Sequence, residues 1–307
     1  MITVALREKM GLPPCFDARV RVSGSAASSN LDKSTLFDQL HAIEPAQRRF
    51  VVRFYSKANK VICTWGVYVP RVKRTGARSV SAQEHQDNLK RATYRAAANI
   101  RRDLLSIAAD RMVTLTYVSN QQNRIVALGH LAQWVRIMRR RFSWWASVTV
   151  LEYQERGAVH FHVAVSGFYD IDVLRSEWQA VIGEKSIVNI AFRPDGKGNA
   201  CSKLASYLSK YLSKEMDSGR KEGEHRYFRT QGIERPREVY HIPLTAPRNE
   251  EVSLSLDVIM TLLGSTDQGL PNIFISKQVG HGGGYVTGDL DTKGTVSYGE
   301  MDKAARV

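Results

Sequence analysis

The pattern of apolar and polar residues predicts alternating strands and helices through the middle of the chain. Short runs rich in valine, tyrosine and other β-forming residues indicate strands, whereas apolar residues three or four positions apart indicate helices. The predicted strands are residues 50–56, 61–69, 112–118, 145–153, 158–166 and 186–192. The predicted helices are residues 83–109, 127–142, 172–182 and 201–216, with a further apolar, helix-like segment at 252–263.

The order of these elements predicts the fold class. From residue 112 the order is β-α-β-β-α-β-α, which indicates an α+β fold with strands paired in a sheet and helices on one face. We expect three parts. These are an N-terminal region, 1–82, with a β-hairpin at 50–69, a central domain, 83–249, and a C-terminal tail, 250–307, without an assigned role.

Positive charge is concentrated ahead of and within the central domain. The chain carries 44 Lys and Arg against 30 Asp and Glu, a net charge of +14. Residues 70–141 hold 15 of these cations and 4 of the anions, whereas residues 250–307 hold 4 and 8. A basic surface attracts polyanions, most often nucleic acid, although a solvated basic face that aids solubility has the same composition. Because they end the helix at 127–142 in a cluster, we assign Arg139, Arg140 and Arg141 to DNA binding.

Several classes of protein are excluded by what the sequence lacks. No apolar run approaches the roughly 18–20 residues of a membrane span, and the first residues lack the apolar core of a signal peptide. Cys15, Cys63 and Cys201 lie far apart, which excludes a disulfide scaffold and fits a reducing cytoplasm. The glycine-rich HGGGYVTGD lacks the Lys-Ser/Thr pair of a phosphate-binding loop, so we expect no nucleotide cofactor and no helicase activity.

Two histidines in one predicted strand form a candidate metal site. Alternation along the strand places His160 and His162 on one face, about 7 Å apart, with Phe161 on the other. If the preceding loop has three residues, Glu152 lies opposite His160; if it has two, Glu152 points away and Glu155 is the alternative. Two imidazoles and a carboxylate suit Mn²⁺ or Mg²⁺, whereas two solvent-exposed histidines without a metal are the simpler interpretation.

A second candidate is the helix at 201–216, which contains ASYLSKYLSK. Tyr207 and Tyr211 are one turn apart beside an apolar stripe, and Lys203, Lys210 and Lys214 form a ridge beyond them. Half-buried packing is the common role of tyrosines so spaced. However, each tyrosine is followed three residues later by a lysine, and an ammonium near a phenol favours phenolate and attracts phosphate.

These motifs, taken in order, resemble those of the HUH endonucleases. HFH at 160–162 followed by YLSKYLSK at 207–214 is similar to the two-tyrosine rolling-circle replication initiators of small single-stranded DNA phages and related plasmids. VTLTY at 113–117 resembles the first motif of that family, and the order of histidines before tyrosines is that of the initiators. The resemblance covers about residues 83–240, and a transposase or relaxase relative is the alternative within the superfamily.

The resemblance implies a fold, a reaction and partners. It implies a central antiparallel sheet of ferredoxin- or RRM-like arrangement, with the tyrosine helix across the histidine face. It implies that His160, His162 and Glu152 hold Mg²⁺ or Mn²⁺, that Tyr207 and Tyr211 are nucleophiles, and that Lys210 and Lys214 steady the phosphate. The product is a 5′-phosphotyrosine link and a free 3′-hydroxyl at a single-stranded DNA origin, in the cytoplasm of a bacterial host that supplies helicase and polymerase.

Two interpretations from other classes stay open at this point. A non-catalytic, RRM-like nucleic-acid-binding protein, for which Lys203 and the basic helices provide phosphate contacts, predicts salt-sensitive binding without cleavage. A metal enzyme of the cupin type also has an H-x-H motif, but it requires a glutamate soon after the second histidine. The sequence VAVSGFYD that follows His162 contains none.

Overall fold

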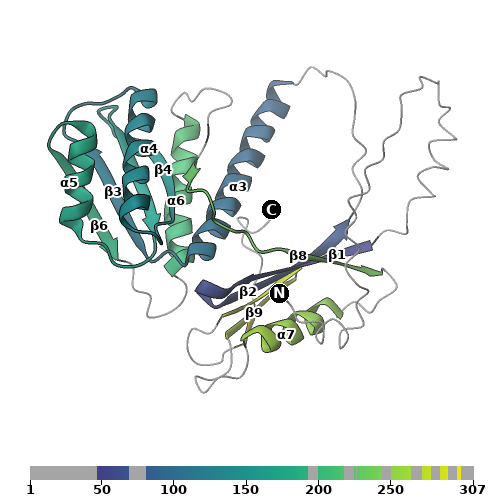
Figure 1. Cartoon of the computed structure of the whole chain (residues 1–307). Coiled ribbons are helices and arrows are strands. Elements are labelled where there is room, and N and C mark those ends of the chain that lie inside the picture. Colours follow the sequence, from purple (N-terminus) through teal and green to yellow (C-terminus); the bar gives the residue numbers. More distant parts are fainter. Residues whose placement is uncertain are drawn as a thin grey trace, which may run out of the picture.

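The computed structural model describes residues 47–68, 81–192, 200–217, 225, 227–243, 250–263, 272–277, 284–289 and 296–298. These residues form two sheets, one of six strands and one of five, with a long helix, α3 (Ala82–Ile107), between them (Figure 1). All strand pairs except β11 with β9 are antiparallel. The predicted α+β class is therefore confirmed.

The five-stranded sheet carries the histidine motif in its central strand. Its strands are β3 (Arg111–Tyr117), β4 (Ser147–Tyr153), β5 (Val159–Val165), β6 (Ser186–Phe192) and β7 (Phe228–Arg229), in the order β6-β3-β5-β4-β7. With the helices between them, the first four strands follow the β-α-β-β-α-β plan of ferredoxin-like folds. Each of these four strands lies within two residues of its predicted bounds.

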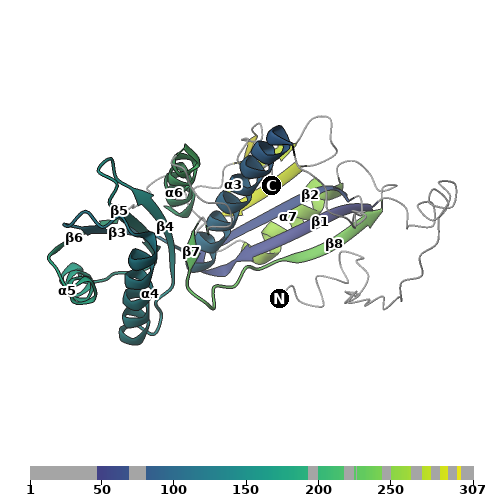
Figure 2. The same cartoon turned by 90° about the horizontal axis from the view of Figure 1, so that it is seen from above.

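Helices cover both faces of this sheet, so the expectation that they lie on one face is wrong (Figure 2). On the Phe161 face, α4 (Arg124–Arg141) and α5 (Ile171–Ile182) bury Trp134 and Trp178. On the histidine face, α6 (Ala200–Asp217) and α3 cover an apolar half of the sheet, which is formed by Met112, Val148, Val150 and Ala164. Those side chains must leave water, and a second layer of helix is therefore required.

Helix α3 begins at the predicted N-cap. The Ser81 hydroxyl accepts a hydrogen bond from the backbone N–H of Glu84, and the Glu84 carboxylate accepts one from the backbone N–H of Ser81. This capping box satisfies two of the backbone donors at the first turn. The helix ends at Ala108 in the left-handed conformation, and its Ile100 and Leu104 pack in the same core as α6.

The six-stranded sheet joins segments from both ends of the chain. It consists of β1 (Gln47–Tyr55), β2 (Lys60–Tyr68), β8 (Glu238–Pro243), β9 (Asn272–Lys277), β10 (Gly284–Asp289) and β11 (Val296–Tyr298), in the order β11-β9-β10-β2-β1-β8. The first two pair as the predicted hairpin, through a short 3₁₀ turn, Ser56–Ala58, and Asn59 at φ 45°. The division of the chain after residues 82 and 249 stays a prediction, but the strand pairing crosses both boundaries.

Helix α7 (Glu250–Leu263) gives part of the C-terminal segment a structural role. It packs Val258, Ile259 and Leu263 on one face of the six-stranded sheet. A buried ion pair, Arg48 with Glu251 at 2.7 Å, links α7 to β1. The glycine-rich HGGGYVTGD ends in β10, where Gly288 lies against Ile259 and has no space for a Cβ.

Within the part of the chain that the structure describes, none of the helices combines the length and the apolar composition that crossing a membrane requires. Cys63 and Cys201 are buried free thiols. Cys15 and the Ser/Gly/Ala-rich residues 23–30 lie outside the described residues.

Candidate active site

The turn between β4 and β5 sets the register of the histidine strand. The backbone N–H of Gln154 donates to the carbonyl of Ala158 at 2.9 Å, which leaves Glu155–Gly157 as a three-residue loop. Gly157 has φ +84°, a left-handed conformation that few residues other than glycine adopt. This loop places Glu152 opposite His160, which is the register in which Glu152 was the expected carboxylate.

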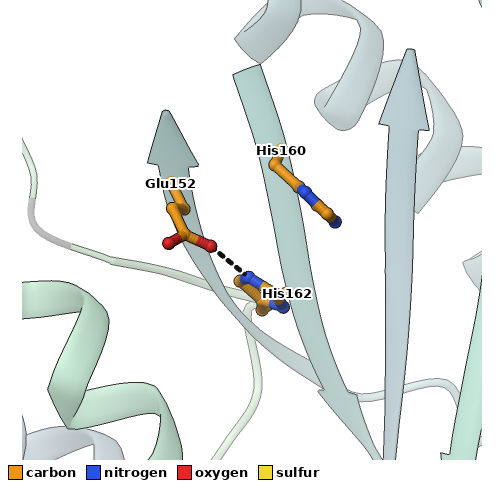
Figure 3. Close-up of side chains that lie close together, drawn as sticks. All are labelled: Glu152, His160 and His162. Atoms are coloured by element: carbon orange, nitrogen blue, oxygen red, sulfur yellow. Dashed lines mark hydrogen bonds and ion pairs between the residues drawn. The ribbon is translucent and has the colours of Figure 1, made fainter. Parts of the chain in front are cut away.

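Glu152, His160 and His162 come together on one face of the sheet (Figure 3). Each offers one ligand atom, and these atoms all lie within 4.8 Å of one another. The Glu152 Oε2 and His162 Nε2 atoms are 2.9 Å apart. His162 is buried, and the other two are half-buried, so the group lies at the edge of the packed core. Two imidazoles and a carboxylate at this spacing are a donor set for a divalent metal ion.

Two neighbours hold the ring of His160, and neither was expected from the sequence. Thr116 Oγ1 lies 3.1 Å from its Nε2, and the amide of Gln154 lies 3.1 Å from its Nδ1. Thr116 is directly opposite His160 on β3, inside the VTLTY segment. Finding it requires the register between two strands that lie far apart in the sequence. Binding of a metal at one ring nitrogen requires release of one contact, and the other can then fix the ring.

Burial keeps His160 neutral. Loss of solvent, together with the nearby charge of His162, lowers the pKa of His160 to about 4, although Glu152 acts in the opposite direction. A neutral imidazole has a lone pair available for coordination, whereas a protonated one does not. The site is therefore in the protonation state that metal binding requires at neutral pH.

Helix α6 brings both tyrosine rings to His162. The Tyr211 ring is stacked on the imidazole with centroids 4.1 Å apart, and the Tyr207 ring meets it edge-on at 6.1 Å. The two phenol rings are 5.1 Å apart. They differ in burial, since Tyr211 is 8% exposed within the core and Tyr207 is half-buried at its edge. Leu204 and Leu208, on the apolar stripe of the helix, hold α6 against the sheet.

The predicted basic residues are arranged less closely around this site. Lys203 and Lys210 are exposed on α6, and the side chain of Lys214 lies outside the described residues. Arg139, Arg140 and Arg141 end α4, which packs on the opposite face of the sheet, and Arg141 is paired with Glu177 at 3.0 Å. The structure does not bring these arginines to the histidines, so their role in DNA binding stays a prediction.

A buried charge cluster supports the tyrosine helix from behind. Asp103 of α3 is fully buried and accepts hydrogen bonds from Arg229 at 2.8 Å and from Arg235 at 2.6 Å to each oxygen. Arg235 also donates to the Tyr227 hydroxyl, and Tyr227 packs against the core that contains Tyr211. An aspartate on the buried face of a helix was a visible signal. Its partners, more than 120 positions away, had none.

Comparison with known families places this site inside a matched region. A family of replication-associated proteins, described by the name ORF2, matches residues 110–216, which run from β3 to α6 and include Glu152, both histidines and both tyrosines. No curated protein matches the chain, and no solved structure matches it. Over residues 110–216 the chain is therefore similar to replication-associated proteins, which indicates a function in DNA replication.

Proposed function

We propose that the chain is a rolling-circle replication initiator that cleaves single-stranded origin DNA by metal-dependent transesterification to tyrosine. The observation that carries the proposal is the position of two tyrosine rings against the histidine that shares a metal-ligand group with Glu152 and His160. The similarity of residues 110–216 to replication-associated proteins supports the same function.

Glu152, His160 and His162 fit a divalent ion by the chemistry of their donors. An oxygen and two nitrogens from adjacent strands form a partial ligand set that leaves positions for a phosphate oxygen, and this set suits Mn²⁺ or Mg²⁺. Such an ion, when bound, supplies Lewis-acid stabilisation of negative charge on the scissile phosphate. The buried apolar layer beneath the histidines keeps their orientation fixed.

Tyr207 is the first nucleophile in this proposal because it is the more accessible of the two rings. Its hydroxyl oxygen, on losing the proton, attacks the phosphorus in line with the bond to the 3′ oxygen. That bond breaks, the 3′ oxygen takes up a proton, and the 5′ side of the DNA remains linked to the tyrosine. One phosphodiester replaces another, so no nucleotide is consumed.

Tyr211 provides the second nucleophile after one round of synthesis. Its ring lies on His162 and next to Tyr207, so both hydroxyls can serve one phosphate site in turn. Attack by Tyr211 on the regenerated origin releases a 3′-hydroxyl, which displaces Tyr207 and closes the circle. Lys210, with Lys214 further along the helix, adds positive charge near the phosphate. The host supplies the helicase and polymerase in its cytoplasm.

The test is formation of a covalent adduct. Single-stranded oligonucleotides that tile the DNA molecule encoding the chain are incubated with the protein and Mn²⁺, then separated on a denaturing gel. We expect one oligonucleotide to give a protein–DNA adduct and a shorter product with a 3′-hydroxyl, and chelation of the metal to remove both. Binding without an adduct on any oligonucleotide would overturn the proposal and favour a non-catalytic nucleic-acid-binding protein.

A further inference from the structure

The six-stranded sheet has one face packed on α7 and another that presents polar and aromatic side chains. Arg48 pairs with Glu251 of α7, so its neighbour Arg49 points to the opposite face, as does Arg53. Among the described elements, the C-terminal half of α3 packs on that face, where it contacts Tyr55 and Ile62. We call it the α3-side face. In Figures 1 and 2, α3 leaves the sheet at this contact and rises over β1 and β2.

Arg53 is the central cation of the α3-side face. Its guanidinium is half-buried and donates to Thr64 Oγ1 on β2 at 3.3 Å. The structure gives it no carboxylate partner among the described residues. A half-buried cation without a carboxylate is costly, and an anionic ligand would offset that cost.

Helix α3 adds a second row of positive charge that meets the first. Arg91, Arg95 and Arg102 lie within about 40° of one another around the helix, on the side opposite its buried core residues. Burial, and next the charge of Arg102, lowers the pKa of Arg53, so the two guanidinium groups are close. Two rows from separate elements, β1 and α3, therefore converge on one place.

Few acidic groups oppose these rows. Asp103 is enclosed by Arg229 and Arg235, and Glu84 and Asp87 lie beyond Arg91, at the start of α3. On the sheet, Asp289 lies opposite Lys60, at the end of β10. From Arg91 to Arg102 the helical row is about 16 Å long, enough to follow several phosphates of a nucleic-acid backbone.

Aromatic rings accompany the arginines on the same face. Strand pairing places Phe274 level with Arg53, through Thr287 and Ile62, and places Tyr285 beside Thr64. Both rings are half-buried, with centroids 5.7 Å apart, and neither belongs to the core beneath α7. Rings on a sheet surface stack with unpaired bases, which a duplex does not expose.

We propose that the α3-side face binds single-stranded DNA that flanks the cleaved bond, with arginine rows on the backbone and Phe274 and Tyr285 under the bases. The inference rests on the proposed function, because it assigns a second contact to the same substrate. It gives the joined chain ends a purpose, since β2 and β10 together present Arg53's neighbours and Tyr285. Duplex DNA and protein partners are the alternatives that the test must exclude.

The test measures binding without metal, so that it does not depend on cleavage. Fluorescence anisotropy of a labelled single strand of about 20 nucleotides is recorded over a range of salt for the full chain and for Arg53→Gln with Arg102→Gln. We expect about tenfold weaker binding, and a salt dependence (log K against log salt) that is less steep by about 1.4. Tyr285→Leu should weaken binding without changing that slope.

A matched control removes the same charge elsewhere. Arg136→Gln with Arg175→Gln alters two exposed arginines of α4 and α5, on the far side of the other sheet, and should leave both affinity and slope nearly unchanged. Equal slopes for the two double variants, or competition by duplex DNA as effective as by single strands, would overturn the inference. An absent covalent adduct would count against the proposed function alone, and this comparison would still decide the surface.

Discussion

The Tyr211 ring lies parallel to the His162 imidazole, with centroids 4.1 Å apart and an interplanar angle of 16°. Tyr207, one turn earlier, meets the same imidazole edge-on. The two tyrosines therefore have unequal positions at one site, and their burial differs in the same direction. This inequality gives the first prediction.

Removing the hydroxyl of Tyr207 should reduce the first strand cleavage far more than removing that of Tyr211. We expect Tyr207→Phe to lower the yield of adduct on a single-stranded oligonucleotide with Mn²⁺ by about tenfold or more. Tyr211→Phe should retain most of it, because its ring packing is kept. Denaturing gels measure the adduct. Undiminished adduct in the variant that lacks both hydroxyls would contradict the assignment of these tyrosines as nucleophiles.

Loss of any one proposed ligand should weaken metal binding. His160→Ala, His162→Ala and Glu152→Gln should each lower the affinity for Mn²⁺ by about tenfold or more, since each removes one donor of a three-donor group. Isothermal titration calorimetry measures the affinity directly. His85→Ala, which alters an exposed histidine on α3, is the matched control. Equal affinities for all four variants would show that Mn²⁺ does not bind to these side chains.

Substitution of Asp103 should destabilise the fold strongly. Asp103→Asn keeps the shape but leaves Arg229 and Arg235 without their buried countercharge, so we expect a loss of about 3 kcal/mol in the free energy of unfolding. Asp172→Asn breaks an ion pair with Arg175 in which the aspartate is 79% exposed, and should cost less than about 1 kcal/mol. Urea denaturation compares the two. Similar losses would mean that the Asp103 cluster is not important for stability.

A side chain at position 157 should disturb the turn that aligns Glu152 with His160. Gly157→Ala forces a left-handed backbone on alanine and brings its Cβ within 3.0 Å of the Gln122 amide, so we expect a loss of about 1–2 kcal/mol. Weaker Mn²⁺ binding should accompany the loss. Gly129→Ala, in the interior of α4 with open space around it, should instead stabilise by about 0.5–1 kcal/mol. Thermal denaturation and Mn²⁺ titration of both variants provide the comparison.

Much of the central sheet could be predicted because its patterns are local. Alternation along a strand fixes which side chains share a face, so His160 and His162 were expected together and Phe161 on the other side. The hydroxyl of Ser81, followed three residues later by Glu84, likewise predicted the start of α3. Such features depend on neighbours within a few residues, and the sequence displays those neighbours directly.

The alignment of Glu152 with His160 was left open because two loop lengths fitted the sequence. A slip of one residue between β4 and β5 turns the carboxylate to the opposite face, and only the folded hairpin, with Gly157 in a left-handed conformation, decides between them. Thr116 entered the site for the same reason, since its position depends on how β3 pairs with β5.

By itself, the sequence determined which residues can ligate a metal, which can act as nucleophiles and which faces of their elements they occupy. Tertiary structure decided that Tyr211 lies on His162, that helices cover both faces of the five-stranded sheet, and that Cys63 lies opposite Val286 in a sheet built from both ends of the chain. These relationships depend on which distant segments pack together. That choice is set by the burial of whole faces, and no short stretch of sequence encodes it.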